Sequence, residues 1–242
     1  MGASVLSMNN VSKKFGSKEV LKKISFTMEQ GDIVGYLGPN GSGKTTTLMT
    51  LVGLIKFDQG QIQILNYDVN KEYEKLYGKV AVLFDENGLF EKLTARQNLL
   101  FYLKAFHKQN GINFALNLMK KLGMDNDLDR KVSTFSKGMK RKLALVRCLI
   151  VNPRIILLDE PFDGIDVECR DSIIKLLKEY RKEHNISIIL TSHVMADIEE
   201  LANRIVVIQE GQIVVNEAID IFSARGGKNL TENYLRVIKH DK

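Results

Sequence analysis

The sequence predicts an α/β fold: a core with a mainly parallel sheet, an N-terminal antiparallel β region and an inserted helical subdomain. Three observations support it. Residues 4–37 alternate apolar and polar side chains between turn signals, as antiparallel strands do. From residue 91 to about 150 the pattern is mainly helical, and no strand is evident. Apolar strand-like segments then return and alternate with a helix, which is typical of a parallel sheet.

The expected elements follow in chain order. Turn signals at residues 16–17 and 30–32 divide the first β region. The expected further strands are 32–38, 60–69, 78–84, 154–160, 186–193 and a hairpin at 204–215. A helix is expected from Thr45 to about Gly53. Helical spacing is expected at Ile112, Ala115, Leu116, Met119, then Leu143, Val146, Ile150, and later Ile173, Ile174, Leu177, Tyr180.

These elements suggest one domain with three parts. The α/β core with its β subdomain is expected at 1–90 and 153–222, and the helical subdomain at 91–152. The polar, basic tail at 223–242 is expected to be a helix or a frayed end. A chain of 242 residues can bury such a core as a single domain.

Composition limits the class of protein. Apolar residues make up 44% of the chain and charged residues 26%, values that are ordinary for a soluble globular protein. The net charge of +6 mildly favours anionic partners. Cys148 and Cys169 show neither metal-ligand spacing nor a disulfide framework, which indicates a reducing compartment. No apolar run approaches the ~20 residues that span a bilayer, and no signal peptide is evident. A cytoplasmic location is therefore expected unless a partner carries the chain to a membrane.

The segment GPNGSGKTT has the spacing of a phosphate-binding loop. Gly38, Gly43, Lys44 and Thr45 fit G-x-x-x-x-G-K-[ST] between an expected strand and an expected helix. Lys44 is expected to reach the β- and γ-phosphates, and the Thr45 hydroxyl to hold Mg²⁺. The helix N-terminus adds partial positive charge. The residues expected to bind the nucleotide here are Gly38, Pro39, Asn40, Gly41, Ser42, Gly43, Lys44, Thr45 and Thr46.

Two later strand ends offer catalytic groups. The apolar segment 155–158 delivers Asp159 and Glu160 to a carboxyl end, where open α/β sheets bind ligands. Asp159 can order the Mg²⁺ shell, and Glu160 can accept a proton from an attacking water. His193 ends another apolar strand, near the expected γ-phosphate, which favours a functional role over a structural one.

The segment FSKGM narrows the choice among P-loop proteins. With the motifs in this order, the chain resembles the ATP-binding subunit of an ABC transporter, through nearly its whole length. The family signature is usually written LSGGQ, and here Ser136 and Gly138 match it. Asp166 resembles the D-loop aspartate and His193 the switch histidine. Phe15 matches the aromatic position on which an adenine can stack, although a half-buried strand Phe remains open.

One position departs from the family pattern. Where a Gln usually precedes the helical subdomain, this chain has Asp85, followed by Glu86. A carboxylate can bind Mg²⁺ directly, so Asp85 is a candidate metal ligand. The alternative is a solvated loop acid.

The resemblance implies a P-loop NTPase with a RecA-like core and a Mg²⁺-dependent ATPase. It implies dimerisation around ATP with a second copy or a homologous ATPase subunit. It also implies a separate transmembrane permease, exporter-like, which would hold the chain on the inner face of the membrane. The alternative is a non-transport ABC ATPase acting on nucleic acid or ribosomes. A third possibility, an ATP-gated binding module with little turnover, is disfavoured by Glu160.

The basic run Lys140, Arg141 and Lys142 bears on that alternative. Such runs are usually solvated helix faces, and no interleaved aromatic residues support nucleic-acid binding.

The signature segment is expected to serve the ATP bound by another copy of the chain, with Ser136 and Gly138 as its contacts. The simpler alternative is that Ser136 only caps its helix.

Overall fold

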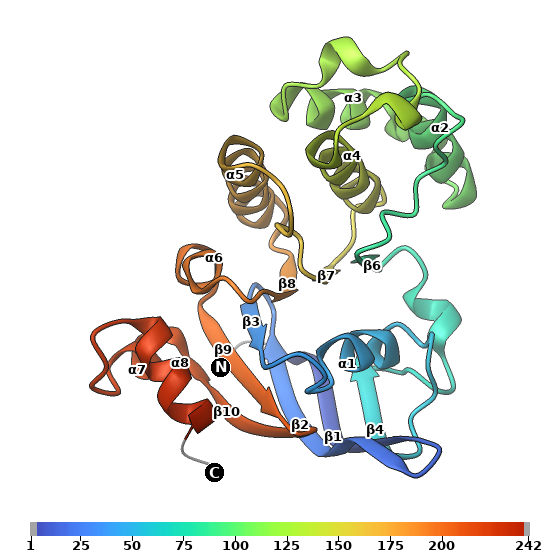
Figure 1. Ribbon diagram of the computed structural model, residues 1–242. Coiled ribbons are helices and arrows are strands. Elements are labelled where there is room, and N and C mark those ends of the chain that lie inside the picture. The colour runs from blue at the N-terminus through green and yellow to red at the C-terminus, as the bar shows by residue number, and fades with distance from the viewer. Residues whose placement is uncertain (1–3, 240–242) are drawn as a thin grey trace. The chain divides into compact units, whose positions relative to one another are not determined.

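A computed structural model describes residues 4–239, which form two compact units (Figure 1). The first comprises the described residues up to Leu76 and those from Ser187 onward, and the second is Tyr77–Ile186. The subdomain boundaries expected near residues 91, 153 and 223 stay predictions. Residues 1–3 and 240–242, at the ends of the expected core and tail, lie outside the described part of the chain.

The first unit contains an antiparallel sheet in the order β2-β1-β4-β5. Its strands are β1 (Ser4–Phe15), β2 (Lys18–Glu29), β4 (Gln59–Ile64) and β5 (Tyr67–Asp68). Alternate residues of β2 are buried, among them Phe26 and Met28, because one face of the sheet covers the core. The strand expected at 60–69 is split, since Leu65 and Asn66 adopt positive φ angles that reverse the chain.

The same unit holds strands that pair in the order β10-β9-β3-β8. They are β3 (Ile33–Leu37), β8 (Ser187–Thr191), β9 (Arg204–Gln209) and β10 (Gln212–Ala218). β3 runs parallel to both β8 and β9, while β9 and β10 form an antiparallel hairpin. Every residue of β3 and β8 is buried, which explains their continuous apolar sequences.

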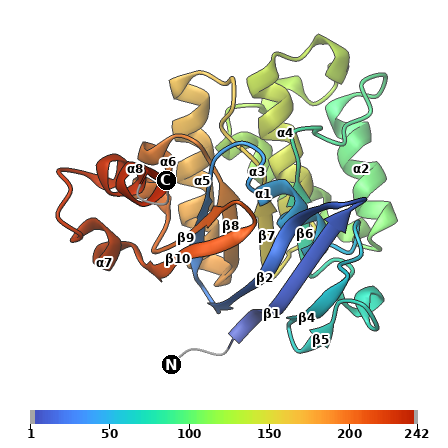
Figure 2. The same ribbon diagram turned by 60° about the horizontal axis from the view of Figure 1, so that its bottom comes forward.

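Helices complete the first unit. They are α1 (Lys44–Leu51), α6 (Met195–Leu201), α7 (Ile219–Ser223) and α8 (Leu230–Lys239), with a 3₁₀ turn at Tyr73–Leu76. The helix expected after the phosphate loop is α1, and the described part of the tail contains α8. The short helix α6 was not expected from the sequence. α7 and α8 lie side by side in both views (Figures 1 and 2).

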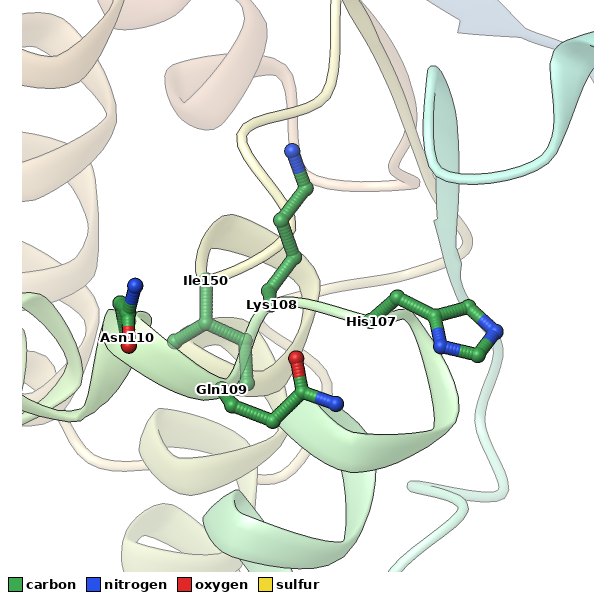
Figure 3. A pocket seen from close by; sticks show the side chains of 6 residues that line it. His107, Lys108, Gln109, Asn110 and Ile150 are labelled. Atoms are coloured by element: carbon green, nitrogen blue, oxygen red, sulfur yellow. The ribbon is translucent and has the colours of Figure 1, made fainter.

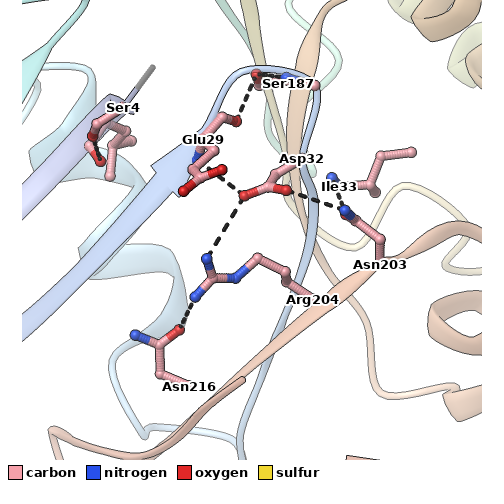
Figure 4. A network of polar contacts seen from close by, with 10 residues as sticks. Ser4, Glu29, Asp32, Ile33, Ser187, Asn203, Arg204 and Asn216 are labelled. Carbon is pink, nitrogen blue, oxygen red and sulfur yellow. Dashed lines mark hydrogen bonds and ion pairs between the residues drawn. The ribbon is translucent and has the colours of Figure 1, made fainter. Parts of the chain in front are cut away.

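A polar network around Asp32 fixes the amino ends of β3 and β9 (Figure 4). Both carboxylate oxygens of Asp32 accept hydrogen bonds, from the Glu29 N–H at 2.9 Å and the Asn203 side chain at 3.1 Å. Asn203 Oδ1 in turn accepts from the Ile33 N–H at 2.6 Å. The network therefore holds the starts of β3 and β9 together and leaves their carboxyl ends for other groups.

The second unit combines a parallel strand pair with helices. β6 (Val80–Leu83) pairs with β7 (Ile155–Leu158), and Leu83 lies opposite Leu158. The helices are α2 (Ala95–Ala105), α3 (Ile112–Lys121), α4 (Lys137–Leu149) and α5 (Val167–His184), with 3₁₀ turns at Gln109–Gly111, Asp125–Asp127 and Val132–Thr134. The apolar face of α4 is buried, as its spacing predicted. In α3 the predicted positions Ala115 and Met119 are buried, whereas Ile112 and Leu116 are only partly buried. Among residues 4–239, no helix is both long and apolar enough to cross a membrane.

Candidate nucleotide-binding site

The phosphate-binding loop connects β3 to α1 in the first unit. A Cβ at Gly38 would lie 2.2 Å from the Ile208 carbonyl oxygen and 2.5 Å from Ser42 Oγ, so only glycine fits there. Gly43 has a φ of 113°, a left-handed conformation that favours glycine, and directly precedes α1. The loop thus turns sharply into a helix N-terminus, where backbone N–H groups face outward.

Two side chains of the loop carry polar groups suited to phosphate. Lys44 is 8% exposed, and its Nζ donates hydrogen bonds to the carbonyl oxygens of Gly38 at 2.7 Å and Pro39 at 3.3 Å. Ser42 Oγ is buried and has no hydrogen-bond partner within the described protein. A buried hydroxyl without a protein partner is costly, and an anion's oxygen satisfies it. The loop therefore fits a phosphate group.

Contacts with β3 fix the position of α1. The buried hydroxyl of Tyr36, in β3, lies 3.1 Å from Thr47 Oγ1, and Thr47 Oγ1 donates to the Gly43 carbonyl at 2.9 Å. Burial raises the pKa of Tyr36, so its hydroxyl keeps its proton for this contact. Thr45, two residues before Thr47 in the same helix, is exposed.

His193 lies at the same edge of the first unit as the loop. Tyr36 and Thr191 are paired in the parallel strands β3 and β8, so Gly38 and His193 each lie two residues beyond that pair. The turn that carries His193 is fixed by Ser192, whose hydroxyl donates to Asp197 at 2.9 Å and accepts from the Val194 N–H at 3.0 Å. His193 itself is exposed.

Phe15 is the last residue of β1 and is 48% exposed, which fits both the adenine-stacking role and a half-buried strand side chain. The Lys13 ammonium lies 5.2 Å from the centre of its ring. The structure leaves its role as an adenine-stacking residue a prediction.

In the second unit, the expected acidic residues follow two paired strands. Asp159 follows β7 and donates its N–H to the Leu83 carbonyl of β6 at 2.8 Å. It is 6% exposed, whereas Asp85, two residues beyond β6, is exposed. Glu160 has a φ of 45°, in the left-handed region, which costs on the order of 1–2 kcal/mol for a residue other than glycine. Surrounding contacts must hold that conformation.

The signature segment begins α4. Ser136 is the N-cap, and its hydroxyl accepts a hydrogen bond from the Met139 N–H at 3.2 Å, so the expected capping role is present. Gly138 packs against the start of α5, where a Cβ would lie 3.1 Å from Cys169 Sγ. Burial raises the pKa of Cys169, which contacts Gly138 as a neutral thiol. Asp166 caps α5 by accepting from the Cys169 N–H at 2.8 Å.

The basic run of α4 differs from the expected solvated face. Lys140 pairs with Glu91, and Lys142 donates to the Leu122 carbonyl at 3.1 Å. Arg141 is only 4% exposed. Each of the three cations thus has a partner within its own unit. The burial of Arg141 was not predicted from the sequence. A signal was present, because Ala144, Leu145 and Cys148 lie on the same helix face as Arg141 and are buried.

A pocket of about 270 Å³ in the second unit does not involve these residues (Figure 3). It lies between the end of α2 and the start of α3, and its lining is His107, Lys108, Gln109, Asn110, Gly111 and Ile150. None of the expected site residues lines it.

The oxygen ligands that Mg²⁺ prefers are present in both units. Thr45 offers a hydroxyl, and Asp159 and Asp85 offer carboxylates, the hard donors suited to this ion. Magnesium at phosphate-transfer sites is usually held by one or two carboxylates together with substrate phosphates. Within residues 4–239, no group of three His, Cys, Asp or Glu side chains gathers as a metal site.

Comparison with known proteins identifies the family. A model of the ABC transporter family matches residues 21–163. The chain is 33% identical to the bacitracin transport ATP-binding protein of Bacillus licheniformis, over 94% of this chain and 74% of that protein. It is 30% identical to the ABC transporter ATP-binding protein NatA of Bacillus subtilis, over 97% of this chain and 98% of that protein. It is 35% identical to a Nod factor export ATP-binding protein of Burkholderia lata, over 90% and 72%.

Solved structures agree with these relatives. The ATP-binding subunit of an ABC transporter matches with a TM-score of 0.88 and 25% identity, over 96% of this chain and 99% of the other. A dimeric ATP-binding cassette in a post-hydrolysis state, bound to ADP and Pi, matches with a TM-score of 0.79 and 26% identity, over 88% and 98%. The fold class predicted from the sequence is confirmed. The chain belongs to the ABC transporter family, as an ATP-binding domain with the P-loop NTPase fold.

Proposed function

We propose that this chain binds and hydrolyses ATP with Mg²⁺, dimerises around ATP and drives a separate transmembrane permease, an exporter. The observation that carries the proposal is the phosphate loop between β3 and α1, with its buried Lys44 and its unpartnered Ser42 hydroxyl. The names of the relatives support export, since one is a Nod factor export protein and another a linearmycin resistance protein of Bacillus subtilis. The dimeric cassette with ADP and Pi supports a dimer.

The catalytic roles follow from the chemistry of the groups. Lys44 and the loop N–H groups bind the β- and γ-phosphates, and Thr45, Asp159 and Asp85 would hold the metal ion. Bound Mg²⁺ would neutralise charge on the phosphate oxygens. Glu160 accepts the proton of the attacking water, and His193 contacts the γ-phosphate. Bond cleavage then rests on positioning and charge stabilisation without a covalent intermediate.

Metal removal tests the proposed hydrolysis. With excess chelator we expect the full-length chain to lose ATP turnover, because the negative phosphates then lack their counter-charge, and added Mg²⁺ should restore it. Phosphate release measures turnover, and the unfolding temperature in chelator serves as the control. Undiminished turnover in chelator would contradict the role of the metal ion.

Asp85 is tested by Asp85→Asn, which keeps the size and one oxygen but removes the charge. We expect a weaker dependence on Mg²⁺, or poorer stimulation by the permease, with the fold intact. A Mg²⁺ titration of hydrolysis, with and without permease, measures both. The matched control is Glu86→Gln at the adjacent exposed acid. Unchanged titration and unchanged stimulation would identify Asp85 as a solvated loop acid.

The permease is expected to contact the apolar side chains around Phe90. Phe90, Leu100 and Phe101 are 42%, 45% and 47% exposed, and the rings of Phe90 and Phe101 are 4.6 Å apart. The backbone of Phe90 is fixed by the buried side chain of Asn98, which accepts from its N–H at 2.8 Å and donates to its carbonyl at 3.0 Å. A grouped apolar patch on a fixed loop suits a protein partner.

A photocrosslinker at position 90 tests this contact in cell membranes. We expect it to capture an integral membrane protein, while the same crosslinker at position 54, in place of an exposed leucine of the first unit, does not. Capture of soluble proteins alone from position 90 would argue against docking there.

A further inference from the structure

Arg141 has an unusual environment for a cation. Only 4% of the Arg141 residue is exposed, and the acceptors of its guanidinium hydrogen bonds are uncharged oxygens. Nε donates to the Pro161 carbonyl at 2.9 Å, Nη1 to the Phe84 carbonyl at 2.8 Å, and Nη2 to the carbonyls of Asp159, at 3.1 Å, and Glu160. The planar fork of an arginine can serve several acceptors at fixed angles, which a lysine cannot do.

These acceptors belong to the two segments that carry the acidic residues. The carbonyls of residues 159–161 follow β7, and Phe84 directly precedes Asp85 at the end of β6. Nη1 also donates to Asn87 Oδ1 at 3.2 Å. One side chain of α4 thus bonds both strand ends at the edge where the proposed metal and catalytic groups lie.

The contact with Glu160 coincides with its left-handed backbone. A residue other than glycine keeps such a conformation only where neighbouring groups hold it. Arg141 Nη2 donates to the carbonyl of Glu160 and to that of the preceding residue, on both sides of the φ rotation of 45°. The direction of the Glu160 side chain depends on this rotation.

Burial lowers the pKa of Arg141, and the nearby charges of Asp85 and Asp159 oppose the shift. The guanidinium keeps its proton, as arginines do in proteins.

We propose that Arg141 is a positioning residue for hydrolysis, which fixes the backbone of Glu160 and ties it to the loop of Asp85 and to the signature helix α4. The inference rests on the proposed catalytic role of Glu160. It assigns Arg141 no contact with ATP, so its loss should affect turnover and leave nucleotide binding intact.

The test uses full-length Arg141→Lys. Lysine keeps the charge but cannot span the carbonyl acceptors. We expect kcat to fall about 10- to 100-fold, because a small misplacement of a catalytic group is enough for such a loss. The KM and Kd for ATP should stay within about twofold. Turnover is normalised to the sites that bind nucleotide, so partial unfolding cannot imitate the effect.

The matched control is Lys142→Gln on the same helix, which loses the hydrogen bond to the Leu122 carbonyl but contacts neither strand end. It should keep kcat within about twofold. If Arg141→Lys folds poorly, Arg141→Gln replaces it, because its amide removes the guanidinium fork but can still donate two hydrogen bonds, so fewer buried carbonyls are left without a donor.

A double variant separates this inference from the proposed function. Added to Glu160→Gln, Arg141→Lys should lower kcat no further, since both changes remove the same group's action. If Glu160→Gln alone kept wild-type turnover, the catalytic assignment of Glu160 would fail. If Glu160→Gln were inactive while Arg141→Lys turned over normally, or if the two losses multiplied, only the role of Arg141 would fail.

Discussion

A Glu160→Gln chain is expected to bind ATP with unchanged affinity and to hydrolyse it at least about 100-fold more slowly than the unmodified chain. Glutamine keeps the length and shape of the side chain. The carbonyl of residue 160 remains available to Arg141, so the left-handed backbone should persist. The lost carboxylate removes the group that accepts the proton of the attacking water. ATP should therefore accumulate unhydrolysed in the site.

Single-turnover experiments with identification of the bound nucleotide measure this result. The matched control is Glu183→Gln near the end of α5, where Glu183 lies 3.5 Å from Lys121 and contacts no expected site residue. It makes the same chemical change and should leave turnover normal. Near wild-type turnover by Glu160→Gln would show that another group acts as the base.

The second prediction concerns a heterodimer of Gly138→Asp and Lys44→Ala chains. Lys44→Ala alone should lose triphosphate binding, because the loop loses its cation. If Ser136 and Gly138 serve the ATP of the partner, the mixed dimer has both lesions in one composite site and keeps the other site intact. It should then close on ATP and hydrolyse at up to about half the wild-type rate, by counting intact sites in a two-fold dimer.

The structure refines the design of this experiment. A Cβ at position 138 would lie 3.1 Å from Cys169 Sγ and 3.9 Å from Asp166 Oδ2, so part of any effect of aspartate is steric and arises within its own chain. Gly138→Ala introduces the same Cβ without charge and is the matched control. Differently tagged chains allow the heterodimer to be isolated.

Closure is the deciding measurement. Coupling between the two sites can suppress hydrolysis while leaving ATP-dependent dimerisation intact. A heterodimer that neither closes on ATP nor hydrolyses it would contradict action on the partner's nucleotide. Lost stability with normal activity per folded molecule in Ser136→Ala would instead indicate that the residue only caps α4.

Local sequence patterns predicted most of the fold. The alternation of β2, the apolar runs of β3, β7 and β8, and the spacing of α4 and α5 each follow from which faces are buried. In β1 the expected alternation is broken, because Val5 and Leu6 are both buried beside an irregularity in the pairing with β2. The boundaries were less accurate, because they depend on single residues. Asn66 and Leu65, with positive φ, divide the strand expected at 60–69. The helix α6 is only seven residues long, too short for a clear period.

In the candidate site, too, only the local features could be predicted. The spacing of the loop glycines and the acidic residues after the apolar strands each lie within a short segment, so they can be recognised in the sequence. The burial of Arg141 is not local, since its acceptors lie 18 to 20 and 54 to 57 residues away in the chain. In the sequence it stood between two lysines as part of a basic run. Only its place on the apolar face of α4 distinguished it.

The hydroxyl of Ser136 has one further consequence. Its lone pair accepts from the Met139 N–H, which leaves the hydroxyl proton available to point away from the helix. Asparagine and aspartate cap helices as well as serine does, but aspartate would bring a negative charge to the place proposed for a phosphate. Threonine, through its hydroxyl, and asparagine, through its amide oxygen and NH₂ group, can likewise accept from the helix and donate outward. Helix capping and anion recognition are thus compatible at this residue because a hydroxyl is both acceptor and donor, and the choice of side chain there is narrower than either role alone would require.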